Sequence, residues 1–326
     1  MTTRAGAELA LLDRWQHDFP LAERPFAEAG RELGLDEAST IAAFRRLRRR
    51  GVLSRIGAVV RPHTAGASTL AAMRVPPERL DEVARIVSRE PLVNHNYERM
   101  HRINLWFVVA GSEPAAVSAT LERIEERTGL PVLDLPLQRA YRIDLGFPLT
   151  GSRRERVPRP FSGLRADHSD RRLLAAIEDG LPLVDRPFRD VARHLGVAES
   201  EVLVRLQRLI AHGIVSRFGC VVHHRRLGYA ANAMAVWNIA DEIANAVAPC
   251  LARNPAVTLC YRRPRRPPDW PYNLFCMVHA KTPRQAYAVI DDLNLVAGTG
   301  LADQAVLFSA RCFKQRGASF VTAGAH

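Results

Sequence analysis

The chain has 326 residues, of which 47% are hydrophobic, and it carries a formal net charge of +12. A chain of this size and apolar content can bury the cores of two ordinary domains, so we expect a folded protein. The charge comes almost wholly from arginine, because lysine occurs only at Lys281 and Lys314. Arginine pairs well with both phosphate and carboxylate, so we expect an anionic partner. The charge alone does not distinguish nucleic acid from an acidic small molecule.

The cysteines and the apolar runs exclude other classes. Five cysteines lie in the second half without C-x-x-C spacing, which disfavours disulfides and structural zinc. No stretch reaches the roughly 18 apolar residues that a membrane span needs, and Asp13 interrupts the apolar run near the N-terminus. We expect a cytoplasmic protein without a membrane segment.

Three short helical patterns open the chain. Residues 8–19 are periodic, residues 24–34 begin near a proline and stop at a glycine, and residues 36–51 start with Asp36 as a helix cap. This order is the outline of a helix-turn-helix domain. The strand pattern at 52–60 would be its wing.

After residue 60 the spacing of the apolar residues predicts further elements in the order strand, helix, strand, strand, helix, strand. This order is typical of the ferredoxin-like fold, an antiparallel sheet with two helices on one face. The expected strands are 68–75, 92–99, 104–111 and 132–143, and the expected helices are 77–90 and 113–129.

The whole series occurs a second time. "LAERPFAEAGRELGL" (21–35) recurs as "LVDRPFRDVARHLGV" (183–197), and "GVLSRIGAVV" (51–60) recurs as "GIVSRFGCVV" (213–222), both 162 residues later. A constant offset indicates an internal duplication. The second copy is expected to have helices at 170–180, 186–196, 198–213, 241–253 and 283–296, and strands at 214–222, 229–239, 256–263, 272–280 and 304–313.

We therefore predict an α+β protein, a tandem duplication of a winged helix-turn-helix followed by a ferredoxin-like (βαββαβ) domain. A segment rich in Gly, Pro, Ser and Arg would link the copies. The predicted parts are helix-turn-helix domains at 1–57 and 169–219, ferredoxin-like domains at 58–149 and 220–326, and a linker at 150–168.

One predicted hairpin, "VNHNYERMHRINLWFVV" (93–109), carries reactive side chains. Because alternate residues of a strand share a face, His95, Tyr97 and Arg99 project together, and His101 follows just beyond. Trp106 lies on the next strand. One face of the hairpin therefore offers acid–base groups, an arginine and an aromatic ring.

Two motifs carry a family resemblance. "NHNYERMHRINLWFV" in the first half and "CYRRPRRPPDWPYNLFCMVHA" in the second resemble the paired signatures of siroheme decarboxylases. The domain arrangement is similar to that of leucine-responsive and asparagine-responsive regulators. In the decarboxylases the two subunit types are often separate chains, whereas here both are fused.

The resemblance implies a carboxy-lyase that needs no cofactor of its own. Such an enzyme removes carboxyl groups from two acetate side chains of siroheme and gives didecarboxysiroheme, on the way to haem d1 or, by another route, to haem. A bacterial cytoplasm is implied with it. The flat, polycarboxylated substrate matches the side chains of the first hairpin.

The resemblance also points to His95 and His101 as catalytic residues. Histidine is the side chain best suited to deliver a proton near neutral pH to the carbon that loses carbon dioxide. Either histidine could instead be an axial ligand of the siroheme iron, which belongs to the substrate, and no metal site of the protein alone is expected. Arginines would orient carboxylates and aromatic rings would pack on the macrocycle. The expected substrate-binding residues are Tyr97, Arg99, Trp106, Tyr261, Arg262, Arg263, Arg265, Arg266, Trp270 and Tyr272.

The second signature differs from the first. Aligning Tyr97 with Tyr261 places Leu259 where His95 stands in the first half, and the turn of the second hairpin is five residues longer. Either the first half alone is catalytic and the second supplies a wall, or both form one composite pocket. We expect one histidine-bearing site supported by both halves.

Two other functions stay open. A leucine-responsive transcription regulator would read DNA with residues such as Ser39 and Arg45 near the start of its recognition helix. In the second copy Glu199 and Glu201 stand at that end and repel phosphate, so we expect no specific DNA partner. A non-catalytic tetrapyrrole sensor would need one iron ligand, and not two proton donors. The expected partner is siroheme or a related iron tetrapyrrole, and the duplicated chain would form an internal pseudo-dimer, with further homo-oligomers left open.

Overall fold

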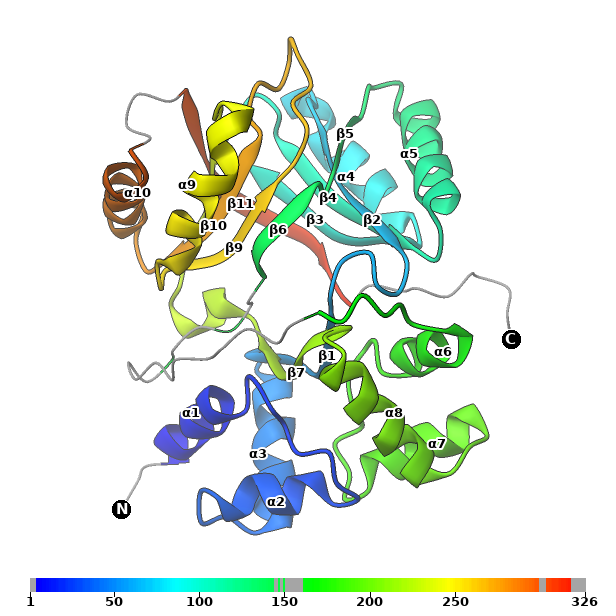
Figure 1. The fold of residues 1–326 in the computed structure, drawn as a ribbon. Coiled ribbons are helices and arrows are strands. Elements are labelled where there is room, and N and C mark those ends of the chain that lie inside the picture. The colour runs from blue at the N-terminus through cyan, green and yellow to red at the C-terminus, as the bar shows by residue number, and fades with distance from the viewer. Residues whose placement is uncertain (1–3, 144–145, 147–148, 150–160, 299–302, 318–326) are drawn as a thin grey trace. The chain divides into compact units, whose positions relative to one another are not determined.

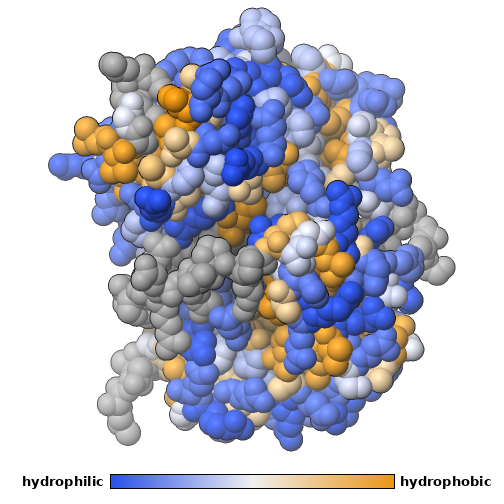
Figure 2. All heavy atoms as spheres, viewed as in Figure 1, coloured by the Kyte–Doolittle hydropathy of each residue, from blue (hydrophilic) through white to orange (hydrophobic). Residues whose placement is uncertain are grey.

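The computed structural model describes residues 4–143, 146, 149, 161–298 and 303–317. They form two compact units, and each unit takes parts from both copies of the repeat. The helical unit draws on residues 1–65 and 146–227, and the sheet unit on 66–145 and 228–324 (Figure 1). Hydrophilic residues cover most of the face in Figure 2, where apolar residues form separate small areas.

In the helical unit the first copy forms three helices, of which the first begins and ends earlier than the expected 8–19. They are α1 (Arg4–Arg14), α2 (Pro25–Arg31) and α3 (Glu37–Arg49), followed by strand β1 (Leu53–Val60). The Asp36 side chain accepts a hydrogen bond from the Ser39 backbone N at 2.7 Å and so caps α3. Fully buried Phe26 and Phe44 contribute to the core between the helices.

The second copy repeats these elements as α6 (His168–Ala176), α7 (Pro187–Leu195), α8 (Glu199–Ala211) and β7 (Val215–Val222). An ion pair recurs with the elements. Buried Glu8 pairs with Arg46 in the first copy, and buried Asp170 pairs with Arg208 in the second. The duplication inferred from the sequence thus extends to side-chain contacts.

The strand expected as a wing in each copy has a different partner. β1 does not form a hairpin within its own copy; it pairs antiparallel with β7, and Gly57 lies opposite Gly219. Each copy supplies one strand only, and the two strands satisfy each other's backbone N–H and C=O groups. A Cβ at Gly219 would lie 2.5 Å from the Trp15 carbonyl oxygen, so the close approach of the backbone requires glycine there.

The sheet unit holds the two ferredoxin-like copies. The first has strands β2 (Ala67–Met73), β3 (Val93–Arg99), β4 (Leu105–Gly111), β5 (Leu133–Pro136) and β6 (Arg139–Ile143), with a 3-10 turn (Pro77–Arg79) and helices α4 (Leu80–Arg89) and α5 (Pro114–Thr128). The second has β8 (Ala231–Trp237), β9 (Val257–Arg262), β10 (Leu274–Ala280) and β11 (Gln304–Gln315), with α9 (Asp241–Arg253) and α10 (Pro283–Ala297). A short 3-10 segment (His224–Leu227) precedes β8.

All of these strands join one sheet in the order β5-β2-β4-β3-β11-β8-β10-β9-β6. The copies are joined because the last strand of each reaches the other: β11 pairs with β8 and then with β3, and β6 pairs with β9. The segment 132–143, expected as one strand, is therefore two. Pro136, which has no N–H to donate, ends β5 before the chain crosses to its second partner.

The strands have two buried faces. One face of each copy packs on its own helices, with residues such as Val83, Val87 and Phe107 in the first copy. The opposite face, which we call the inner face, packs copy against copy. Its core consists of Leu70, Ala72, Ile103, Trp106, Leu135, Met234, Val236, Trp270, Phe275, Met277 and Leu307.

The predicted domain boundaries stay predictions. β1 and β7 run across the expected limits at 57/58 and 219/220. Of the expected linker at 150–168, residues 150–160 lie outside the described residues, as do residues 318–326. Among the helices that the structure describes, none has the length and apolar character needed to cross a membrane.

Candidate functional site

Strand β3 turns two of the expected site residues to the inner face. Tyr97 lies opposite inner-face Trp106 on β4, and the rings of His95 and Tyr97 stack with centroids 6.2 Å apart. Asn96, between them, points to the helices, where its Nδ2 donates to the Ala84 carbonyl at 3.0 Å. The alternation read from the sequence therefore places this histidine and tyrosine on a common face.

Ring contacts continue from β4 into the loop of the second copy. Trp270 meets Trp106 edge to face at 4.9 Å between centroids, and it meets His101 at 5.7 Å with an interplanar angle of 85°. Trp270 is fully buried. We call His95, Tyr97, Trp106, Trp270 and His101 the aromatic ladder. Ring contacts join its first two members and its last three, Tyr97 and Trp106 are partners on neighbouring strands, and the two histidines stand at its opposite ends.

The ring of His101 is fixed by its own loop. Its Nδ1 accepts a hydrogen bond from the Ile103 backbone N at 3.1 Å, so the neutral ring carries its proton on Nε2. Burial lowers the pKa of His101, and the charge of Arg102 lowers this pKa further. The ring therefore presents an N–H donor at Nε2, and in this tautomer Nε2 has no lone pair for a metal.

Arg99 and Arg263 occupy equivalent positions, and each binds a strand of the other copy. Arg99 Nη1 donates to the Leu307 carbonyl at 3.2 Å and to Ser309 Oγ at 3.1 Å, both on β11. Arg263 Nη1 donates to the Leu135 carbonyl on β5. Both hydrogen-bonded strands lie near the C-terminal end of their own copy.

The guanidinium groups are buried with these strands. Arg99 is 8% exposed, and burial lowers the pKa of Arg263. Arg263 also lies over the Tyr261 ring, 4.7 Å from its centroid. Both arginines lie on the inner face, and the contacts described here use part of their donors within the protein.

Arg262 and Arg265 do not join the inner face. Both bind Asp241 at the start of α9, at 2.7 Å and 3.0 Å, and Arg265 Nε also donates to Asn238 Oδ1 at 2.8 Å. Alternation along β9 turns Arg262 away from Tyr261, and the carboxylate of Asp241 lies on that side. The expected role of these two arginines in substrate binding stays a prediction, and nothing in the sequence indicated their ion pairs with Asp241.

The long loop of the second hairpin is tied in two ways. Arg266 and Trp270 exchange two backbone hydrogen bonds of 2.7 Å, and Arg102 Nη2 donates to the Asp269 carbonyl at 2.7 Å. Tyr272 meets the Trp270 ring at 4.9 Å. The two loops are thereby joined beside His101.

Sequence reasoning missed the two asparagines that anchor the loops. Asn104 exchanges two hydrogen bonds of 2.9 Å with the backbone of Val75. Asn273 does the same with Ile239, at 2.9 and 2.8 Å. The repeated "NLW" and "NLF" of the two signatures is the signal that could have revealed them.

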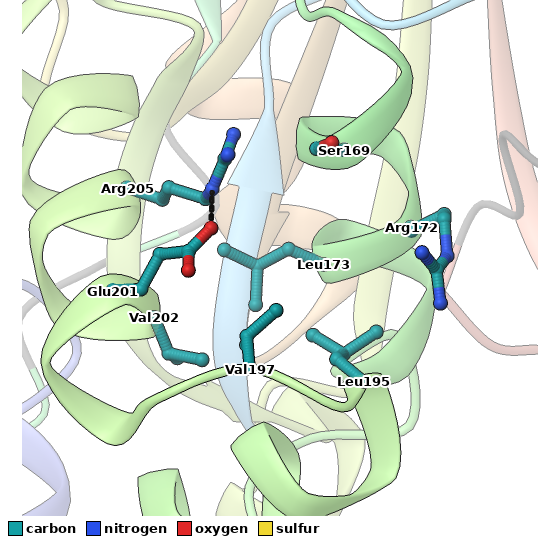
Figure 3. A pocket seen from close by; sticks show the side chains of 8 residues that line it. All are labelled: Ser169, Arg172, Leu173, Leu195, Val197, Glu201, Val202 and Arg205. Atoms are coloured by element: carbon teal, nitrogen blue, oxygen red, sulfur yellow. Dashed lines mark hydrogen bonds and ion pairs between the residues drawn. The ribbon is translucent and has the colours of Figure 1, made fainter.

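A shallow concavity in the helical unit is a poorer candidate. Leu173, Leu195, Val197 and Val202 line it with Ser169, Arg172, Glu201 and Arg205 (Figure 3). Arg205 Nε donates to Glu201 Oε1 at 3.0 Å, so two of its three charged side chains already pair with each other. Among the described residues, no group of three or more His, Cys, Asp or Glu side chains is placed to hold a metal ion.

Comparison with known proteins decides the family. A family model of the helix-turn-helix domain of NirDL-like siroheme decarboxylases matches residues 8–53 and 170–215, and a model of the AsnC-like ligand-binding domain matches 65–142 and 226–314. A siroheme decarboxylase NirDL subunit of Paracoccus denitrificans (strain Pd 1222) is 46% identical over 326 residues, 99% of this chain and 100% of the relative. The chain belongs to the siroheme decarboxylase family. The resemblance and the duplicated α+β fold read from the sequence are confirmed.

Two further siroheme decarboxylases match one part of the chain and nearly all of it. A NirD subunit of Stutzerimonas stutzeri is 50% identical over 139 residues, which are 43% of this chain and 91% of that subunit. A crystal structure of the siroheme decarboxylase NirDL in co-complex with an iron-uroporphyrin III analogue has a TM-score of 0.67 and 26% identity, and the match covers 98% of this chain and 94% of that chain. That protein binds an iron porphyrin.

Proposed function

We propose that this chain removes the carboxyl groups from two acetate side chains of siroheme, giving didecarboxysiroheme and two molecules of carbon dioxide. The observation that carries the proposal is the full-length likeness to a siroheme decarboxylase NirDL subunit. The iron belongs to the substrate, and the enzyme uses no further cofactor. The reaction takes place in the cytoplasm.

His95 and His101 are the proposed proton donors. When a carboxylate leaves as carbon dioxide, the electron pair of the broken C–C bond stays on the methylene carbon, which needs one proton to become a methyl group. A histidine gives this proton from its imidazolium form and returns to the neutral ring. At His101, forming the imidazolium interrupts the hydrogen bond from the Ile103 N–H. Because the two rings stand at opposite ends of the aromatic ladder, each histidine serves one of the two acetates.

Ligation of the substrate iron is a poor role for His101. Its Nδ1 is held by the Ile103 N–H, so coordination through Nε2 would require moving the ring proton and losing this hydrogen bond. If a histidine of this pair binds the iron, we assign that role to His95.

The rest of the inner face binds the macrocycle. Tyr97, Tyr261 and Tyr272, which are only partly buried, supply flat faces and edges for the ring system. The fully buried Trp106 and Trp270 support them from within the core. Arg99 and Arg263 supply positive charge toward the carboxylates that remain. Closely packed rings around a leaving carboxylate exclude water.

The helical unit holds the copies together in this proposal and does not read DNA. Arg24 binds Glu37 at the start of α3, and Arg186 binds Glu199 at the start of α8. The end of each recognition helix that would enter a groove thus presents a carboxylate already paired with an arginine. The ion pairs make these two arginines less available for contacts with phosphate.

Anaerobic incubation with siroheme, followed by mass spectrometry of the pigment, tests the proposal. Loss of the mass of two carbon dioxide molecules supports the enzyme. Unchanged mass with a shifted absorption band would identify a tetrapyrrole sensor. A salt-sensitive shift of DNA in a gel, with the pigment unaltered, would identify a regulator.

A further inference from the structure

We propose that Trp270 is the positioning residue of His101, supplied by the second copy of the repeat to a proton donor of the first. The inference rests on the proposed function of His101. It assigns a purpose to the five-residue extension of the second hairpin loop, which has no counterpart in the first.

The contact geometry restrains the imidazole from one side. The Trp270 indole meets the His101 ring at 85° with centroids 5.7 Å apart, an edge-to-face arrangement that aromatic pairs prefer. The Ile103 N–H restrains the same ring through Nδ1. Together the two contacts set the direction in which Nε2 points.

Trp270 can act in this way because it is held rigidly. Its backbone exchanges two 2.7 Å hydrogen bonds with Arg266, and its ring contacts Trp106 and Tyr272, each at 4.9 Å. Arg102, the neighbour of His101, donates to the carbonyl of Asp269. The two loops are therefore joined on both sides of the imidazole.

The indole N–H of Trp270 indicates that filling space in the core is not the only reason for a tryptophan at this position. Trp106 Nε1 donates to the Ile103 carbonyl and Trp237 Nε1 donates to Asn294 Oδ1. Trp270 Nε1 is buried, and no acceptor for it occurs among the residues that the structure describes. A buried donor without an acceptor destabilises the fold, so phenylalanine would suit a purely structural position better.

The test compares Trp270→Ala and Trp270→Phe with wild type in the full chain. Trp237→Phe is the matched control, because it removes another fully buried indole on the helix-packed face of the second copy. The His101 titration is followed by NMR of histidine-labelled protein, and decarboxylation is followed in parallel. The charged or titratable groups on the two loops are the same in all variants: Arg102, Arg265, Arg266, Asp269 and Tyr272.

Removal of Trp270 is expected to expose His101 to water. Its midpoint should rise toward the ordinary value of about 6.5 in Trp270→Ala, rise less in Trp270→Phe, and stay unchanged in Trp237→Phe. The kcat should fall about 10-fold or more in Trp270→Ala, because a misplaced catalytic group loses rate steeply.

A folded Trp270→Ala protein with the wild-type His101 midpoint and wild-type kcat would overturn the inference. If Trp270→Ala fails to fold, a Trp270→Phe protein whose midpoint matches the Trp237→Phe control would overturn it equally. A raised midpoint in a chain whose wild type does not decarboxylate siroheme would support the positioning role while the proposed function fails.

Discussion

The loops that close the two equivalent hairpins differ far more than the strands they join. Each loop follows an arginine that clasps the other copy, Arg99 or Arg263, and ends at an asparagine anchor, Asn104 or Asn273. Between these ends the first loop carries His101, whereas the longer second loop carries Trp270 against it. The duplication has thus kept the frame in both copies and divided the site between them.

The largest effect is expected where the copies differ chemically. His95→Ala or His101→Ala should lower kcat by about 100-fold or more, the usual worth of a positioned acid. Leu259→Ala, the matched change in the second copy, should keep substantial activity. The measurement is the rate of carbon dioxide loss under anaerobic conditions. Turnover equal to that of the wild type in both histidine variants would refute their roles.

The same variants sharpen the division of labour between the histidines. If each serves one acetate, then His95→Ala or His101→Ala should accumulate pigment that has lost the mass of one carbon dioxide molecule. Mass spectrometry at long incubation times shows this directly. The assignment fails if neither variant ever yields the singly decarboxylated pigment.

The clasping arginines should have similar effects on stability in both copies. Arg99→Met and Arg263→Met should each lower the free energy of unfolding by about 1.5–3 kcal/mol, because charged donors to buried carbonyls are lost. Arg262→Met, which breaks an ion pair with exposed Asp241, should cost at most about 1 kcal/mol. Urea denaturation measures the free energy of unfolding of all three variants. An equal loss in Arg262→Met would show that the hydrogen bonds of Arg99 and Arg263 to the other copy contribute no more than an exposed ion pair.

The asparagine anchors offer a closer match between copies. Asn104→Ala and Asn273→Ala each remove two hydrogen bonds to the backbone, and each should destabilise the protein by about 1–3 kcal/mol. Thermal unfolding of the single variants measures this. A difference well above 1 kcal/mol would mean that the two hairpins are not held alike.

The smallest effect concerns pH and His101. Because its pKa is lowered in the folded protein, the unfolded chain takes up the proton first, so the contribution of His101 to stability is present above about pH 6.5 and is lost as the pH falls toward the folded pKa. His101→Gln should therefore lose less stability than wild type on acidification across this window. An identical fall in both proteins would contradict the lowered pKa.

Local patterns predicted the elements well because they depend on nearby residues. The helix at 241–253 begins and ends as expected, and the alternation in "HNY" placed His95 and Tyr97 on one face. Pairing between copies was beyond such patterns: nothing near β6 indicates that its partner is β9. For the same reason the sequence did not show that Arg262 binds Asp241, or that Trp270 meets His101.

We expect the two histidines of the first copy and Trp270 of the second to contribute to one site. A crystal structure of the full chain with siroheme, prepared without oxygen, shows whether they do. The macrocycle should lie on the inner face, with one acetate side chain beside His95, another beside His101, and Trp270 still in contact with the His101 ring. A pigment bound elsewhere, or in contact with neither histidine, would rule this arrangement out.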